Sequence, residues 1–274
     1  DNPNHLTPDT VIKIPRDWFR VRDASAALVA VRGEVEITHP DGTQQIVEGS
    51  RLADEPLLLV ESSEVATAEN SMATLEFADG SQLLLQSESR LKIEGLATLG
   101  DGSINEMELY LDKGRIENEI PKSIITNTNY NVITNRGTSS VRGTSFRVNV
   151  DDEEQAIFEV LDGGVNVASH VHDGAALDLD AGKAALVKDA DTPLAPIPLL
   201  DPPHFTTLPT LIEDIPIKIE VEEREGVYGY HTLIVPFGGN IKEPISSQVS
   251  QGATILGDAI EDGHYHLLIS GIDA

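Results

Sequence analysis

The stretch Val141-Arg142-Gly143-Thr144-Ser145-Phe146-Arg147-Val148 gives the clearest strand signal in the chain. From Phe146 onward apolar and polar residues alternate, so that Phe146, Val148 and Val150 share one face. Alternation with a period of two is typical of a strand that buries one face. The sequence therefore predicts a half-buried strand here, and the same alternation carried backwards turns Arg142 towards the inside.

An inward Arg142 has two structural explanations. Its guanidinium is buried against backbone carbonyls or a carboxylate, because unpaired donors carry a heavy desolvation cost. Alternatively, Gly143 forms a bulge that returns the side chain to solvent. Both explanations make Val141, Arg142, Gly143, Thr144 and Phe146 a structural motif. The competing hypothesis is that Arg142 binds a ligand.

This motif resembles the hallmark of the FecR domain. In that family a short segment that contains threonine precedes the motif, and here the segment is Ile133-Thr134-Asn135. Asn135-Arg136 stands where the family has proline after the threonine, which leaves the turn type open. Further segments follow in the family's order: Val31-Arg32-Gly33 with Val35, Ala73-Thr74-Leu75 to Asp79-Gly80-Ser81, Leu109 with Gly114-Arg115, Gly164-Val165-Asn166-Val167, and Ala181-Gly182. The resemblance covers residues 25–190 and implies a periplasmic module of short strands with a β-solenoid or roll-like core.

The composition excludes several classes of function. Aspartate and glutamate number 46 against 19 lysine and arginine residues in a chain of 274, a net charge of −27. This charge opposes nucleic-acid and anionic-lipid partners, which are bound through Lys and Arg. It is compatible with solubility, divalent-cation binding or a halotolerant surface. The chain lacks cysteine, which excludes disulfides and thiolate chemistry. We also expect no membrane-spanning segment, because no apolar run is long enough.

Residues 1–24 are predicted to be an N-terminal arm. Its prolines and apolar residues resemble the end of a LysM module, although Asp9 stands where glycine is usual. The resemblance implies a peptidoglycan-binding module upstream, whereas the alternative is an arm that packs on the next domain. The sequence begins at Asp1 without a signal peptide, so we expect a cut or mature fragment. The residues that carry the resemblance are Asn2-Pro3, Leu6-Thr7-Pro8, Ile12-Lys13-Ile14-Pro15 and Trp18.

Asp-Gly pairs at 41–42, 79–80, 101–102, 162–163 and 173–174 mark turns between short apolar runs. At 79–80 a three-residue loop opposes Leu75 to Leu83 and keeps one face apolar. At 173–174 a similar loop opposes Val167 to Leu179. At 162–163 a two-residue loop opposes Val160 to Val165, which makes residues 156–180 a three-stranded meander. In a solenoid, some of these turns would join successive rungs instead.

Seven prolines between 191 and 216 predict an extended linker, with a domain boundary near Asp201. Beyond it, residues 217–274 resume the strand pattern, with alternation in Ile217, Ile219 and Val221. The segment Gly263–Ile269 resembles a late strand of an immunoglobulin-like or fibronectin type III module. We therefore expect an all-β chain, in which a β-sandwich follows the FecR-like domain and is either a small variant or truncated at Ala274.

No residue pattern supports catalysis, because the nucleophile elbow G-x-S-x-G and phosphate-binding loops are both absent. We predict a non-enzymatic protein without a cofactor. His264 and His266 are spaced so that both imidazoles lie on one strand face, and His170 forms a weaker pair with His172. These histidines are either solvated or ligands for zinc or nickel. The acidic run at 151–154 lacks the spacing of a calcium loop.

The sequence predicts a binding or scaffold module of the periplasm or cell surface, associated with peptidoglycan through its upstream module. One alternative is a FecR-like regulator that relays an envelope signal through contacts with an envelope protein. A second alternative is a calcium-dependent surface or adhesion module. No ligand-binding residues can be named from the sequence.

Overall fold

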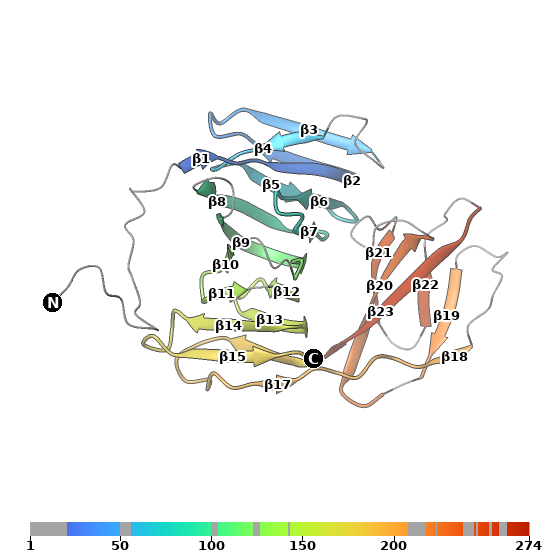
Figure 1. Cartoon of the computed structure of the whole chain (residues 1–274). Coiled ribbons are helices and arrows are strands. Elements are labelled where there is room, and N and C mark those ends of the chain that lie inside the picture. Colours follow the sequence, from blue (N-terminus) through green and yellow to red (C-terminus); the bar gives the residue numbers. More distant parts are fainter. Residues whose placement is uncertain are drawn as a thin grey trace.

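A computed structural model describes residues 21–49, 56–99, 104–122, 127–141, 143–207, 217–222, 224–237, 244, 246–251, 254–257 and 262–273. Strands and turns make up this part of the chain, which confirms the predicted all-β class (Figure 1). No helix in it is long and apolar enough to cross a membrane.

Seventeen strands form one sheet that is folded on itself into a roll with two faces. The first face pairs β3-β2-β5-β8-β9-β10-β11-β14-β15, and the second pairs β4-β2-β6-β7-β9-β12-β13-β16-β17. The long strands β2 and β9 belong to both faces. The bounds are β1 Val21–Asp23, β2 Ala26–Thr38, β3 Gln44–Gly49, β4 Leu57–Leu59, β5 Glu64–Thr67, β6 Met72–Glu76, β7 Gln82–Leu85, β8 Arg90–Leu99, β9 Ile104–Glu119, β10 Asn127–Ile133, β11 Gly137–Val141, β12 Ser145–Val150, β13 Ala156–Asp162, β14 Gly164–Ser169, β15 Ala176–Asp180, β16 Lys183–Val187 and β17 Ile197–Pro198.

Glycines let β2 and β9 pass from one face to the other. Gly33 and Gly114 have φ values of +71° and +86°, a left-handed conformation that favours glycine. In each case the next amide donates a hydrogen bond to a serine hydroxyl from a neighbouring turn. The Glu34 amide lies 3.0 Å from Ser71 Oγ, and the Arg115 amide lies 2.9 Å from Ser89 Oγ. The same arrangement thus bends both long strands.

The core of the roll lies between the two faces and contains three aromatic rings in edge-to-face contact. The centroid of the Tyr130 ring lies 5.9 Å from that of Phe77 and 6.1 Å from that of Phe146. The Tyr130 hydroxyl donates a 2.8 Å hydrogen bond to Asn118 Oδ1. Burial, and secondarily the charge of Asp79, raises the pKa of Tyr130 well above its usual range. The remaining core is made of Val, Leu and Ile side chains from alternate strand positions.

The observed strand pairings test the predicted registers. Leu75 opposes Leu83 and Gly80 has φ +82°, so the three-residue loop at 79–80 is confirmed. At 173–174 the prediction is wrong by two residues, because Val165 and not Val167 opposes Leu179. The longer loop is held by a hydrogen bond from the Ser169 amide to the Ala175 carbonyl oxygen.

The hairpin predicted at 162–163 is also wrong, and with it the three-stranded meander. β13 pairs with β12 and β16, whereas β14 pairs with β11 and β15 on the other face. The turn at Gly163 therefore joins successive rungs, which is the solenoid alternative. Alternation of side chains cannot distinguish the two arrangements, because both bury the same residues.

The predicted strand at 145–150 is confirmed as β12. Phe146, Val148 and Val150 are buried, and the residues between them are half-buried. Its neighbours are β9 and β13, which place it in the interior of the second face. The first strand of the roll begins earlier than predicted, because residues 21–23 of the expected arm form β1 and pair with β8. Residues 1–20, which carry the LysM resemblance, lie outside the described part.

The C-terminal region has two sheets of three strands each. One pairs β18 (Phe205–Thr207) with β19 (Ile217–Val221) and β22 (Thr254–Gly257). The other pairs β20 (Val227–Pro236) with β21 (Ser246–Gln251) and β23 (Tyr265–Asp273). The side chains of Ile219, Val221 and Tyr230 pack together between the two sheets. The immunoglobulin-like assignment stays a prediction.

Two strands fall in the predicted linker at 191–216. β17 pairs with β16 of the roll, and β18 pairs with β19 of the C-terminal region. Asp201 lies between these strands and forms a 3.2 Å ion pair with Arg224. The expected boundary near Asp201 thus separates a strand of the roll from a strand of the C-terminal region.

Candidate functional site

The predicted motif lies inside the roll. Val141 and Thr144 are buried, and the Thr144 hydroxyl donates a 3.0 Å hydrogen bond to the Gly164 carbonyl oxygen. Phe146 is fully buried in the aromatic cluster. Gly143 has φ +59°, and a Cβ there would lie 3.1 Å from Lys122 Cγ. These contacts are packing contacts. Arg142 lies outside the described residues, so its orientation stays open.

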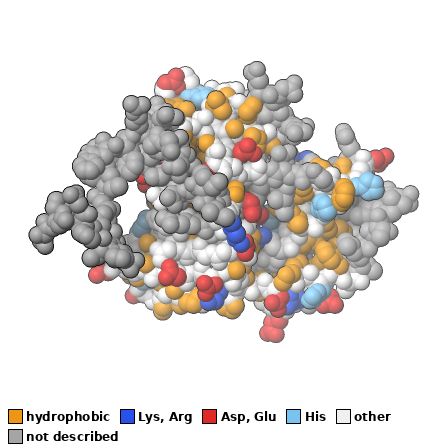
Figure 2. Space-filling model, in the orientation of Figure 1, with side chains coloured by type: hydrophobic (Ala, Val, Ile, Leu, Met, Phe, Trp, Pro, Cys, Tyr) orange, Lys and Arg blue, Asp and Glu red, His pale blue; other side chains and the backbone are white. Residues whose placement is uncertain are grey.

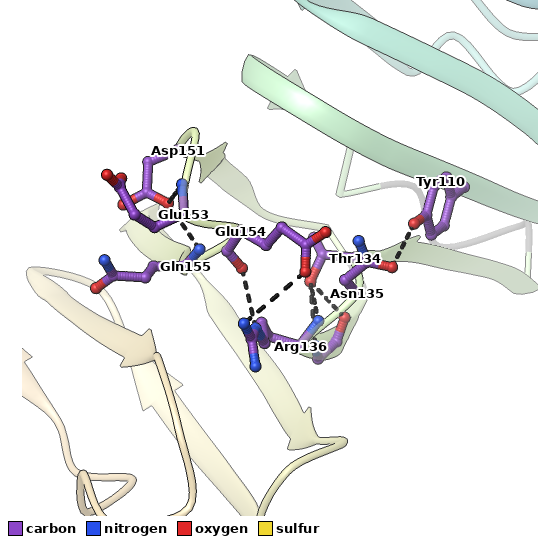
Figure 3. A network of polar contacts seen from close by, with 9 residues as sticks. Tyr110, Thr134, Asn135, Arg136, Asp151, Glu153, Glu154 and Gln155 are labelled. Carbon is purple, nitrogen blue, oxygen red and sulfur yellow. Dashed lines mark hydrogen bonds and ion pairs between the residues drawn. The ribbon is translucent and has the colours of Figure 1, made fainter.

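The turn at Thr134–Arg136, where the sequence departs from the family pattern, is fixed by side chains (Figure 3). Thr134 Oγ1 accepts hydrogen bonds from the amides of Arg136 and Gly137, at 3.2 and 3.1 Å. The Arg136 side chain donates to the Glu154 carbonyl oxygen at 3.3 Å and lies 3.8 Å from the Glu154 carboxylate. Arg136 thus ties this turn to the acidic turn at 151–154.

In the acidic turn at 151–154, the Asp151 carboxylate binds backbone amides of the same turn. Asp151 Oδ1 accepts hydrogen bonds from the amides of Glu153 and Gln155, at 3.0 and 2.7 Å (Figure 3). This is ordinary turn chemistry, in which aspartate satisfies the following backbone donors. These two hydrogen bonds hold the turn in shape.

The predicted metal-binding histidines lie in two separate places. His264 and His266 are exposed on or beside β23, and the His266 ring lies 5.1 Å from that of Phe237. His170 Nε2 lies 2.9 Å from Thr138 Oγ1. Within the described ranges, no group of three or more His, Asp or Glu residues could hold a metal ion. Zinc or nickel binding stays a prediction without a supporting ligand set.

The C-terminal region packs against the second face of the roll, a contact that sequence reasoning missed. Leu233 of β20 packs with Met72 of β6 and Leu84 of β7, and Leu268 joins them. β20 is therefore buried on both faces, with Tyr230 against its partner sheet and Leu233 against the roll. The continuous apolar run in β20 is the sequence signal that could have revealed this burial.

Beside this apolar contact, charged residues of the roll form a row across three strands. Arg147 Nε lies 3.1 Å from the Glu117 carboxylate, and its guanidinium lies 4.0 Å from that of Glu159. These side chains are no more than 21% exposed. Because these side chains are largely removed from water, opposite charges among them attract more strongly than they would at an open surface.

His231 of β20 is buried next to this row. Its Nε2 lies 2.9 Å from Ser247 Oγ. Burial first, and then the positive charges of Arg115 and Arg147, lower the pKa of His231 to about 3, whereas the Glu117 carboxylate acts in the opposite direction. The imidazole is therefore neutral at physiological pH.

Acidification should weaken the protein through His231. The folded-state pKa of His231 lies below its unfolded value of 6.5, so the unfolded chain takes up the proton first as the pH falls. Stability is then lost from about pH 6.5 downwards and levels off near about pH 3, with about 2 kcal/mol lost by about pH 5. Urea unfolding at several pH values measures this loss. The control is His231→Gln, which should lack this component, and equal slopes for both proteins would contradict the prediction.

The end of the roll formed by β3 and β4 exposes apolar side chains. Ile46 is 61% exposed, Leu58 58% and Val60 42%. Within the described part of the chain, β3 and β4 pair only with β2. Figure 2 shows hydrophobic side chains among the atoms at this end, whereas acidic side chains are spread over the face. This open edge, defined as β3, β4 and Val60, is the candidate site for protein contact.

Comparison with known proteins supports the family resemblance for part of the chain. Residues 63–166 match the family model described as FecR protein. No curated protein matches the sequence. Two crystal structures of a candidate anti-sigma factor from Parabacteroides distasonis ATCC 8503 are similar, each at 16% identity, with TM-scores of 0.40 and 0.39. Each alignment covers 49% of this chain and 59% of that one, so the chain spans about three fifths of their length.

The matched residues run from the start of β5 to β14. They include the aromatic cluster, the turn at Thr134–Arg136 and most of both faces of the roll. The match to the FecR protein family therefore lies within the roll, which continues beyond residues 63–166 at both ends.

Proposed function

We propose that this chain is a signalling regulator of the bacterial envelope that acts by binding a protein partner, and not by catalysis. The match of residues 63–166 to the FecR protein family supports this role. The open edge carries the proposal, because it offers a surface that a partner can bind. A location in the periplasm or at the cell surface belongs to the same proposal.

A sheet edge binds proteins by accepting a further strand. Unpaired backbone groups of an edge strand template this addition, and exposed side chains select the partner. β3 is six residues long and mostly exposed, and it ends at Gly49. Ile46 and Leu58 add exposed apolar surface to this edge. We expect the partner to supply an extended segment with apolar side chains at alternate positions.

The peptidoglycan association predicted from the sequence is a separate proposal. It depends on residues 1–20, which lie outside the described part, and on a module upstream of them. Calcium-dependent adhesion has no ligand group behind it in the described ranges. Signalling through a protein partner is therefore the function that we test.

The test uses the double variant Ile46→Lys and Leu58→Lys in the native host. A partner bound at the open edge would have to bury the two introduced charges, so the substitutions should weaken its binding. Both positions are exposed, so the core of the roll should stay intact. We expect the double variant to reproduce the transcript changes of a gene deletion. We also expect a photo-crosslinker at residue 46 of the otherwise unchanged chain to capture one envelope protein.

The matched control is Ile197→Lys with Leu200→Lys near the other end of the roll, where these residues are 42% and 37% exposed. This control should behave as the wild type in both experiments. A double variant of the open edge that leaves transcript levels unchanged would contradict the proposed role, provided that both proteins accumulate equally.

A further inference from the structure

A polar cleft of about 940 Å³ lies between the roll and the C-terminal region. The roll contributes residues of four turns that stack along one edge, and the C-terminal region contributes β20, β21 and the end of β23. The walls are mostly polar, with Val249 as an exposed exception. The cleft is separate from the open edge, so it does not depend on the proposed function.

The inner wall carries hydrogen-bond donors. Gln86 is 5% exposed and lines the cleft, and its Nε2 has no hydrogen-bond partner within the described residues. Gln86 follows β7, and alternation places its side chain on the same face as Leu84, which contacts the C-terminal region. The buried amide is therefore directed towards the space between the two regions. Such a donor is costly unless it is paired.

Two basic residues, Arg115 and Lys113, line the same cleft. The backbone N–H of Gln86 donates a 3.0 Å hydrogen bond to the Arg115 carbonyl oxygen, which places the two residues side by side. His231 also lines the cleft, and its pKa is lowered first by burial and then by the positive charge of Arg115. These two cations beside the buried donor of Gln86 favour an anionic group at this place in the cleft.

The outer wall has the opposite character. Glu69, Glu88, Asp151 and Asp152 line the cleft on the turns of the roll. Glu88 and Asp152 are exposed, so their carboxylates are available to a group at the mouth. The two walls therefore suit a molecule with a carboxylate at one end and a cationic amine at the other.

We propose that the cleft binds a small zwitterion of the amino acid or short peptide class. Gln86 and Arg115 bind its carboxylate, and the exposed carboxylates of Glu88 and Asp152 bind its ammonium group. Bidentate binding of a carboxylate by arginine is strong and directional.

The experiment titrates the ¹⁵N-labelled full chain with glycylglycine up to tens of millimolar and follows the side-chain amide signal of Gln86. We expect a saturable shift of this signal. Glycylglycinamide, which lacks the carboxylate, and N-acetylglycylglycine, which lacks the ammonium group, should each bind at least about tenfold more weakly. No saturable shift with glycylglycine, or equal affinity for all three probes, would overturn the proposal.

Two variants separate the walls of the cleft. Gln86→Leu, followed through the backbone amide signals of the other residues that line the cleft, should reduce the affinity for glycylglycine at least about tenfold, whereas the matched control Gln44→Leu on exposed β3 should not. If Gln86→Leu fails to fold, Asp152→Asn on the exposed wall takes its place. Asp152→Asn should lower the affinity for glycylglycine several-fold and leave the affinity for N-acetylglycylglycine unchanged. Unchanged glycylglycine binding in both folded variants would refute the assignment.

Discussion

Replacing Phe146 with alanine should lower the free energy of unfolding by about 3–5 kcal/mol, the range for large-to-small changes of a buried phenylalanine. Phe146 is fully buried and its ring contacts Tyr130 edge to face. The substitution leaves a cavity at one end of the aromatic cluster, where β9 and β13 flank β12 on either side. These paired strands limit collapse of the cavity, so the loss should lie towards the upper part of the range.

Urea unfolding followed by circular dichroism measures this effect. The control is Ile46→Ala at the open edge, where a side chain that is 61% exposed should contribute less than about 0.5 kcal/mol. A loss below about 1 kcal/mol for Phe146→Ala would mean that the motif does not pack as described.

Substituting Gly114 with alanine should cost about 2–5 kcal/mol, the sum of a backbone term and a packing term. The backbone term arises because φ is +86°, where an L-residue is disfavoured by about 1–2 kcal/mol. The packing term arises because the new Cβ would lie 2.6 Å from Ser89 Cα. That atom is part of the backbone, so relief of the contact requires movement of a neighbouring turn.

Gly182→Ala separates the two terms. Gly182 has φ +81°, and nothing lies within 4 Å of the Cβ position. This control should show the backbone term alone, about 1–2 kcal/mol. Chemical denaturation of both variants gives the difference, and equal losses would exclude the predicted clash at Ser89.

The sequence of β12 was sufficient to predict its strand, because Phe146, Val148 and Val150 alternate with polar residues and one side must be buried. The loop at 79–80 could be predicted for a similar reason. Only one register placed Leu75 opposite Leu83, and the loop residue Gly80 accepts a positive φ. Local pattern and turn chemistry are properties of adjacent residues, so the sequence records them directly.

Which strands pair across the roll could not be predicted in the same way. The residues between Val160 and Val165 are compatible both with a hairpin and with a connection between two rungs of a solenoid. Only the pairing of β13 and β14 on different faces of the roll shows that the connection between rungs is formed. The corners at Gly33 and Gly114 share one pattern, a glycine whose following amide bonds to a serine. The serines come from turns that only the fold brings close to these glycines.

The candidate sites depended most on tertiary structure. The sequence excluded cysteine chemistry and directed attention to Arg142, which lies outside the described residues, and to His264 and His266, which belong to no metal-binding group within them. The open edge exists because β3 and β4 lie at the end of the roll, and the polar cleft exists because the C-terminal region packs on its second face. Exposure and proximity result from long-range packing, so they became visible only when both regions were in place.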